Sequence, residues 1–239
     1  PTMDLDLLGK IDNNIESIIA VIKDAMEVDV EPDGILFNPE TITATRITED
    51  VEYEGVRVRL QGNLGNARVS LQIDIGFGDV IVPGPSKVKY PVLLDFPSPE
   101  LYGYSMESVI AEKFEAMTKR GILNSRMKDF YDIWMLSRMF NFKGTVLADA
   151  IRMTFQNRNT VLSINQAVFD PEFINDPTKN TQWQAFIRKS KIKEALNSFH
   201  EVSKEIQIFI KPIIDSLIEG KAFQGTWDAP GPWQKLKEA

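Results

Sequence analysis

Three aspartates in two apolar segments are the residues best suited to chemistry. Asp4 and Asp6 lie two residues apart in "PTMDLDLLGK", and Asp74 lies in the alternating segment "RVSLQIDIG". Successive side chains of a β-strand point to opposite faces, so Asp4 and Asp6 share one face of a strand predicted over residues 2–8. Two neighbouring carboxylates repel each other, which favours a place in water or around a bound cation.

Asp74 lies on the polar face of its own predicted strand. The apolar face carries Val69, Leu71, Ile73 and Ile75, and the polar face carries Arg68, Ser70, Gln72 and Asp74. Taken alone, Asp74 is a solvated strand residue. In one sheet with Asp4 and Asp6, it predicts a cage for one or two Mg²⁺ ions, which prefer oxygen ligands and share them with substrate phosphates. Such ions polarise a phosphoryl group while a carboxylate takes the proton of an attacking hydroxyl.

A lysine interrupts the apolar stripe of the helix predicted near residues 105–120. The stripe consists of Met106, Val109, Ile110, Phe114 and Met117, and Glu107, Glu112, Glu115 and Lys119 fall outside it. At 100° per residue, Lys113 lies near the middle of this stripe and Arg120 near its edge. Either the lysine stem packs while its ammonium group reaches water, or the face borders a cleft where Lys113 meets a phosphate or a carboxylate.

The next predicted helix, near residues 127–141, carries acids on its apolar face. Asp129 and Asp132 are three residues apart in "KDFYDIWMLSRMF" and therefore share a face. An acid near a helix start is favoured by the helix dipole, but Asp132 lies within the apolar stripe, and buried charges are usually paired. Lys113, Arg120 and Arg126 are the candidate partners. A structural ion-pair network between the two helices explains this pattern without catalysis.

Composition excludes several classes of site. The 239-residue chain has no cysteine and one histidine, which rules out disulfides, thiolate ligands and histidine-rich zinc sites. No apolar run reaches the roughly 20 residues of a membrane span, and a cytoplasmic location fits the absence of cysteine. The net charge of −7 counts against a broad nucleic-acid surface, though not against a local nucleotide site.

The order of predicted elements indicates an α+β fold. A strand and the amphipathic helix "DNNIESIIAVIKDAME" come first, followed by a mixed, mostly antiparallel sheet up to about residue 94. Helices are predicted near 105–120, 127–141, 145–157, 179–191 and 194–219. The segment 170–180 is expected to be a loop, and the glycine- and proline-rich tail "GTWDAPGPWQKLKEA" to pack loosely. We predict a core domain over 1–104 and a helical domain over 105–239.

Four segments resemble the AbiEii/AbiGii-type nucleotidyltransferase toxins of the polymerase-β-like nucleotidyltransferase superfamily. They are "PTMDLDLLGK", "VSLQIDIGFGD", "MESVIAEKFEAMTKRG" and "RMKDFYDIWML", in matching order and spacing. The resemblance covers residues 1–140 well and the remainder more loosely. It implies Mg²⁺-dependent transfer of a nucleotide from an NTP by the toxin of an abortive-infection toxin–antitoxin system, with a cognate antitoxin as partner. Some relatives modify tRNA ends, so the resemblance implies tRNA or another RNA as an acceptor.

The resemblance also implies roles for individual residues. Asp4, Asp6 and Asp74 match the metal ligands, with Asp74 also the candidate base. Lys113, and Arg120 with it, would bind the nucleotide.

The resemblance includes the last motif of the family but lacks the first one. Asp129 and Asp132 match the last motif, in which an aspartate is important for activity. The Gly-Gly/Ser helix start that holds the triphosphate in the family precedes the Asp-x-Asp strand, and this chain starts after it, at Pro1. We therefore expect either further residues upstream or a truncated and inactive form.

Three functions compete at this point. The first is a metal-dependent nucleotidyltransferase, supported by three acids on two strands and an inward lysine. The second is a catalytically inactive nucleotide- or partner-binding module of the same fold. The third, a carboxylate-pair glycosidase, requires one acid in an apolar pocket, and the acids here are arranged for metal instead.

Overall fold

The computed structural model describes residues 4–47, 55–92 and 94–235, and it has the α+β architecture that the sequence predicts. The chain forms two compact units, Pro1–Asp79 and Val80–Ala239. Each unit is described by itself. The predicted boundary at residue 104 lies inside the second unit.

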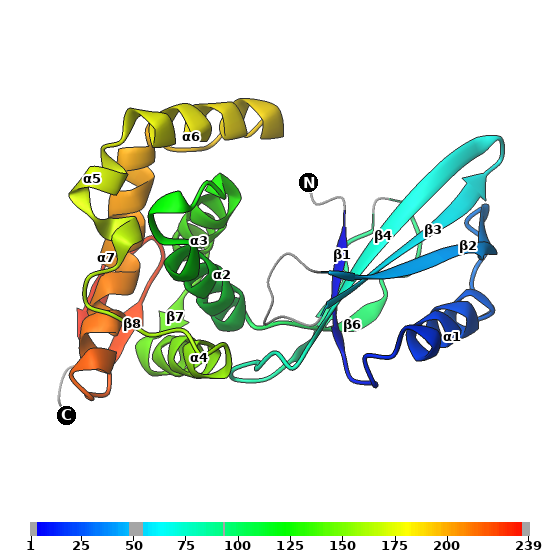
Figure 1. The fold of residues 1–239 in the computed structure, drawn as a ribbon, viewed down its shortest axis with the longest axis horizontal. Helices are drawn as coiled ribbons and strands as arrows, with labels where there is room; N and C mark the ends of the chain where they lie inside the picture. Colours follow the sequence, from blue (N-terminus) through cyan, green and yellow to red (C-terminus); the bar gives the residue numbers. More distant parts are fainter. Residues whose placement is uncertain (1–3, 48–54, 93, 236–239) are drawn as a thin grey trace. The chain divides into compact units, whose positions relative to one another are not determined.

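The first unit is a four-stranded mixed sheet with one helix (Figure 1). Its elements are β1 (Leu5–Gly9), α1 (Ile15–Met26), β2 (Ile35–Ile47), β3 (Gly55–Leu64) and β4 (Ala67–Phe77). The strand order is β1-β4-β3-β2, with β1 parallel to β4 and the other pairs antiparallel. This topology confirms a βα start followed by an antiparallel meander.

Helix α1 covers one face of this sheet. Asn14 caps the helix by accepting a hydrogen bond from the Ser17 amide at 3.0 Å. Ile18 of α1 is buried with five strand residues, namely Val56, Val58, Leu60, Ile73 and Ile75. Because side chains alternate along a strand, the polar residues of β3 and β4 lie on the opposite face. The sheet therefore has an apolar face against α1 and a polar face that carries Asp74.

The second unit is built mainly from helices around an aromatic core (Figure 1). It contains β5 (Ser86–Lys89), β6 (Glu100–Gly103), α2 (Met106–Arg120), the short helix Gly121–Leu123, α3 (Met127–Met139), β7 (Phe142–Lys143), α4 (Gly144–Asn157), the short helix Ala167–Phe169, α5 (Pro171–Ile174), α6 (Pro177–Ser190), α7 (Phe199–Ile218), β8 (Gly225–Trp227) and β9 (Trp233–Lys235). Fully buried Phe130 and Phe199 meet edge to face, with ring centroids 4.9 Å apart.

Hydrogen bonds to the start of α2 attach Val82 to the second unit. The Val82 amide donates to the Ser108 hydroxyl at 2.8 Å, and the Ser105 hydroxyl donates to the Val82 carbonyl. Ser105 also caps α2 by accepting from the Ser108 amide. Hydrophobic periodicity in the sequence does not reveal side chain–backbone hydrogen bonds, so it could not predict these contacts.

The prediction of a loop over residues 170–180 is wrong. Helix α5 occupies Pro171–Ile174, and α6 begins at Pro177. Both helices start with proline directly after an aspartate, and Asp176 accepts a hydrogen bond from the Thr178 amide at 2.7 Å. Proline at the first helical position and aspartate at the N-cap are helix-start signals, but proline and aspartate are also typical of loops, which explains the wrong prediction.

The expectation of a loosely packed tail is also wrong for the residues that the structure describes. Strands β8 and β9 pair with each other, and β8 pairs with β7. The Trp227 indole is 2% exposed and donates to the Ser137 carbonyl at 2.6 Å. The Trp233 indole donates to the Phe209 carbonyl at 2.7 Å. Two tryptophans thus attach the tail to α3 and α7.

We predict that Trp227→Ala destabilises the second unit by about 3–5 kcal/mol, because it removes a buried indole and its hydrogen bond. Urea unfolding followed by circular dichroism measures this change. The control is Leu123→Ala, whose side chain is 83% exposed and whose replacement is expected to change stability by no more than about 0.5 kcal/mol. Equal unfolding midpoints for Trp227→Ala and the wild type would show that the tail is not part of the folded unit.

Candidate active site

The pairing of β1 with β4 brings two of the predicted metal ligands side by side. Asp6 is the register partner of Asp74 in this parallel pair. Register partners on neighbouring strands lie roughly 4.8 Å apart in the backbone and direct their side chains to the same face. Asp4 precedes the first residue of β1 and is exposed. Residues 2 and 3 of the strand predicted over residues 2–8 lie outside the described residues.

An arginine that sequence reasoning missed holds Asp74. The Arg57 guanidinium donates from Nε to one carboxylate oxygen of Asp74 at 2.8 Å and from Nη2 to the other at 2.7 Å. The two residues are cross-strand partners in the β3–β4 hairpin. The side chains are partly buried, 26% and 18% exposed, so this bidentate pair is shielded from much of the solvent.

The hairpin turn carried the signal that could have revealed Arg57. Leu64 and Ala67 are register partners across a two-residue turn within "GNLGN". A two-residue loop fixes the register of both strands. Counting outward from that turn pairs position 57 with position 74.

The donor set suits a divalent cation in its chemistry. Asp6 and Asp74 are neighbouring carboxylates on one face of the sheet, and oxygen is the ligand that Mg²⁺ prefers. Among the residues that the structure describes, no three His, Cys, Asp or Glu side chains lie close enough together to bind a metal ion as a group. Both oxygens of Asp74 are engaged by Arg57. The residues therefore fit the cation in type and register, with Arg57 as its competitor.

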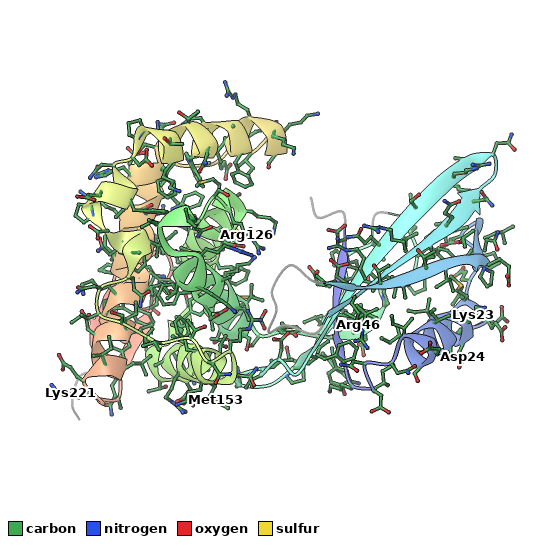
Figure 2. The ribbon with its side chains drawn as sticks, viewed as in Figure 1. Lys23, Asp24, Arg46, Arg126, Met153 and Lys221 are labelled. Atoms are coloured by element: carbon green, nitrogen blue, oxygen red, sulfur yellow. The ribbon has the colours of Figure 1, made fainter. Side chains whose placement is uncertain are left out.

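The second unit assembles the other predicted site residues. Lys113 Nζ of α2 lies 2.8 Å from Asp132 and 3.4 Å from Asp129 of α3. Arg126 Nε, just before α3, lies 3.0 Å from Asp129 (Figure 2 labels this arginine). The ion pairs of Lys113 and Arg126 were predicted as candidates, whereas the contact of Lys128 with Asp132 at 2.7 Å was not. Two helices thus share one network of alternating charges.

Burial sets the electrostatics of this network. The Asp129 side chain is 2% exposed and that of Lys113 is 20% exposed. Burial, the largest single influence on the Lys113 pKa, acts to lower it, but the charges and hydrogen bonds of Asp132 and Asp129 together raise the pKa above its ordinary value of 10.5. The pKa of Tyr131 is also raised, first by burial and then by the charges of Asp132 and Glu194. Lys113 is therefore fully charged at neutral pH.

The buried arc of α2 differs from the predicted stripe. It comprises Ser108, Ile110, Ala111, Phe114, Glu115 and Met117. Lys113 lies at the edge of this arc instead of its middle, and Met106 is exposed. Glu115, expected outside the stripe, is 1% exposed because Arg158 Nη1 donates to it at 3.1 Å and the Thr160 hydroxyl donates to its other oxygen. Long-range partners of this kind leave no periodic trace in the sequence.

The remaining predicted nucleotide-binding residue, Arg120, is the last residue of α2 and is half-buried. Asp4, Asp6 and Asp74 belong to the first unit, and Lys113 and Arg120 to the second. That both groups meet at one nucleotide stays a prediction.

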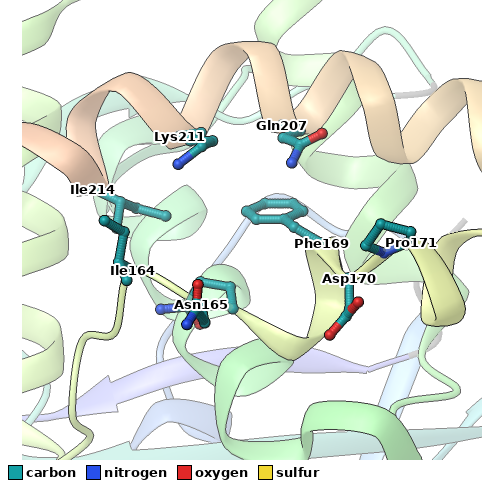
Figure 3. A pocket seen from close by; sticks show the side chains of 9 residues that line it. Ile164, Asn165, Phe169, Asp170, Pro171, Gln207, Lys211 and Ile214 are labelled. Carbon is teal, nitrogen blue, oxygen red and sulfur yellow. The ribbon is translucent and has the colours of Figure 1, made fainter.

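A cavity of about 230 Å³ in the second unit involves none of the predicted site residues (Figure 3). Its lining residues are Ile164, Asn165, Gln166, Phe169, Asp170, Pro171, Gln207, Lys211 and Ile214. Lys211 donates to Asp215 at 2.8 Å, one turn further along α7. The Lys211 ammonium group at the cavity wall therefore already has a counter-ion.

The family profile of "Nucleotidyl transferase AbiEii toxin, Type IV TA system" matches residues 1–205 of the 239-residue chain. The chain belongs to this family. The match includes every predicted site residue and confirms the resemblance drawn from the four segments. It classes the protein as a nucleotidyltransferase and as a toxin of a toxin–antitoxin system.

Two solved structures from Helicobacter pylori are similar to the chain. One is named as a nucleotidyltransferase; it has 15% identity, a TM-score of 0.47 and coverage of 93% of this chain and 82% of that one. The other is JHP933, with 14% identity, a TM-score of 0.43 and coverage of 92% and 78%. No curated protein matches significantly. Among the described residues, no helix combines the length and apolar character that crossing a bilayer requires.

We predict that Lys113→Met lowers stability by about 2 kcal/mol at pH 8, somewhat less than the loss expected for a fully buried pair, because the variant leaves Asp129 and Asp132 without their shared cation. Because the folded-state pKa of Lys113 is raised, its contribution is complete below pH 10.5 and is lost as the pH rises through the folded value. The difference between variant and wild type should therefore shrink by pH 11.5.

Urea titrations at pH 8 and pH 11.5 measure this difference. The matched control is Lys119→Met on the same helix, at an exposed position, which should change stability little at either pH. A Lys113→Met deficit that is equally large at both pH values would contradict the proposed charge contribution.

Proposed function

We propose that this toxin transfers a nucleotide from an NTP to an acceptor hydroxyl and depends on Mg²⁺. The family places the chain among nucleotidyl transferases. The single observation that supports the metal-dependent chemistry is the register of β1 and β4, which sets Asp6 beside Asp74 on the open polar face of the sheet. Asp4, two residues before Asp6, is the third proposed ligand and would have to move toward the other two, because the three carboxylates do not form a cluster in this structure.

Asp4, Asp6 and Asp74 would hold the cation. Bound Mg²⁺ polarises the phosphoryl group and neutralises charge on the departing pyrophosphate. Asp74 would accept the proton of the attacking hydroxyl, for which one of its oxygens must be released by Arg57.

Lys113 and Arg120 would bind the phosphates of the nucleotide. Lys113 is charged at neutral pH, and its ammonium group is held by Asp132 at 2.8 Å and Asp129 at 3.4 Å. We propose that the two aspartates support activity by fixing the direction of this lysine. An ammonium group has three donors, so Lys113 can keep an aspartate and still donate to a phosphate oxygen.

The acceptor and the partner follow from the family at a coarser level. A toxin of a Type IV toxin–antitoxin system implies an antitoxin as counterpart and an NTP as substrate. We propose an RNA, with tRNA as the first candidate, as the acceptor, and the cytoplasm as the location. The net charge of −7 restricts RNA contacts to local basic patches.

One observation favours a second candidate function, a nucleotide- or partner-binding module without catalysis. Arg57 engages both oxygens of Asp74. A carboxylate held permanently in this way has one lone pair of each oxygen engaged and its charge neutralised, which weakens its binding of a cation or a proton. Calorimetry that detects NTP binding without any turnover would support this alternative.

The direct test incubates the full-length encoded protein with labelled NTPs, Mg²⁺ and total RNA. We predict label transfer by the wild type and no transfer in EDTA. Asp74→Asn should lower the rate by roughly 10²–10⁴, as expected for removing a group that acts in proton transfer. Asp6→Asn should cause a comparable loss, because it removes a proposed metal ligand.

The matched control is Asp24→Asn, an exposed aspartate of α1 (Figure 2), which should match the wild type. Label transfer that is equal in wild type, Asp6→Asn and Asp74→Asn would exclude the proposed site, and no transfer by any protein to any acceptor would leave the binding module as the function.

A further inference from the structure

Arg57 stands where a cation would be expected. Its guanidinium donates to both oxygens of Asp74, at 2.8 and 2.7 Å, so it supplies a positive charge and two hydrogen bonds to the carboxylate. Asp6 lies beside Asp74 on the neighbouring strand. The same face of the sheet therefore holds one arginine next to two of the proposed metal ligands.

The next arginine on this face provides a contrast. Arg59 follows Arg57 by two residues and is the cross-strand partner of Gln72. Its Nε donates to the Gln72 amide oxygen at 3.1 Å. Both arginines thus cross from β3 to β4 in the same way, but only Arg57 meets a carboxylate in this hairpin register. The pairing of Arg57 with Asp74 is therefore not a general property of arginines on this strand.

We propose that Arg57 is a placeholder cation, which holds Asp74 in position without metal and competes with a divalent cation that binds Asp6 and Asp74 together. This inference rests on the proposed function of Asp74 as a metal ligand. Arg57 is a positioning residue, because it acts through Asp74. Its presence lowers the affinity for the cation, since the cation competes with two charge-assisted hydrogen bonds.

The placeholder reduces charge repulsion in the metal-free protein. Two carboxylates on neighbouring strands repel each other when no cation is present. Arg57 neutralises one of them and keeps its oxygens on the polar face, where binding needs them. A lysine in its place would be a single point charge without the planar fork that meets both oxygens.

Manganese titration followed by electron paramagnetic resonance, without nucleotide, tests the proposal. We expect Arg57→Gln to bind Mn²⁺ about tenfold more tightly than the wild type, as the loss of a competing interaction worth about 1.4 kcal/mol would give. Arg59→Gln, the matched control, should leave the affinity unchanged. Arg57→Lys should fall between Arg57→Gln and the wild type and provides a second variant if Arg57→Gln does not fold.

The double variant Arg57→Gln/Asp74→Asn locates the effect and should lose the gain. If Asp74→Asn weakens Mn²⁺ binding while Arg57→Gln and Arg57→Lys bind as the wild type does, the placeholder role is wrong and the metal site stands. If Asp74→Asn has no effect in either background, both the placeholder role and the proposed metal site are wrong. Weaker binding by Arg57→Gln would also overturn the proposal.

Discussion

The parallel pairing of β1 with β4 is the constraint on which the proposed chemistry depends. Side chains alternate with a period of two, so a slip of one residue would turn every side chain of β1 to the other face. Ile73 and Ile75 are buried on the α1 side of the sheet, so the side chain of Asp74, between them in β4, points to the opposite face. The register that pairs Asp6 with Asp74 therefore leaves both acids on the open face. The register of a five-residue strand thus decides whether Asp6 can join Asp74 as a proposed ligand of a divalent cation.

In the second unit, a buried carboxylate is paired with a lysine from the neighbouring helix. Asp129 is 2% exposed, and a buried carboxylate requires counter-charges. Lys113 supplies one from α2, which joins α2 to α3 through a single ammonium group. Such buried pairs contribute little net stability, because desolvation offsets their attraction. Their value here is positional, since a lysine held by two aspartates of α3 has a defined direction.

Hydrophobic patterning predicted the parts of the fold that depend on periodicity. The alternation in β4 gave the burial of Ile73 and the opposite face of Asp74 correctly, and the strand-then-helix order gave the fold class. The prediction of a loosely packed tail was wrong because glycine and proline content does not indicate long-range hydrogen bonds. In this tail, the indoles of Trp227 and Trp233 donate to distant carbonyls. At the site, the acids were found by type, whereas Arg57 was missed, because its role follows from hairpin register and not from composition. That the acids and Lys113 serve one nucleotide stays a prediction.

The central claim is that Asp6 and Asp74 share a divalent cation on the polar face of the sheet. Anomalous diffraction from crystals of the protein soaked in Mn²⁺ tests it most directly, because the metal alone gives the signal. The account predicts a peak roughly 2 Å from carboxylate oxygens of both aspartates. A fully soaked crystal with no peak at these carboxylates, and with Arg57 still paired to Asp74, would contradict it.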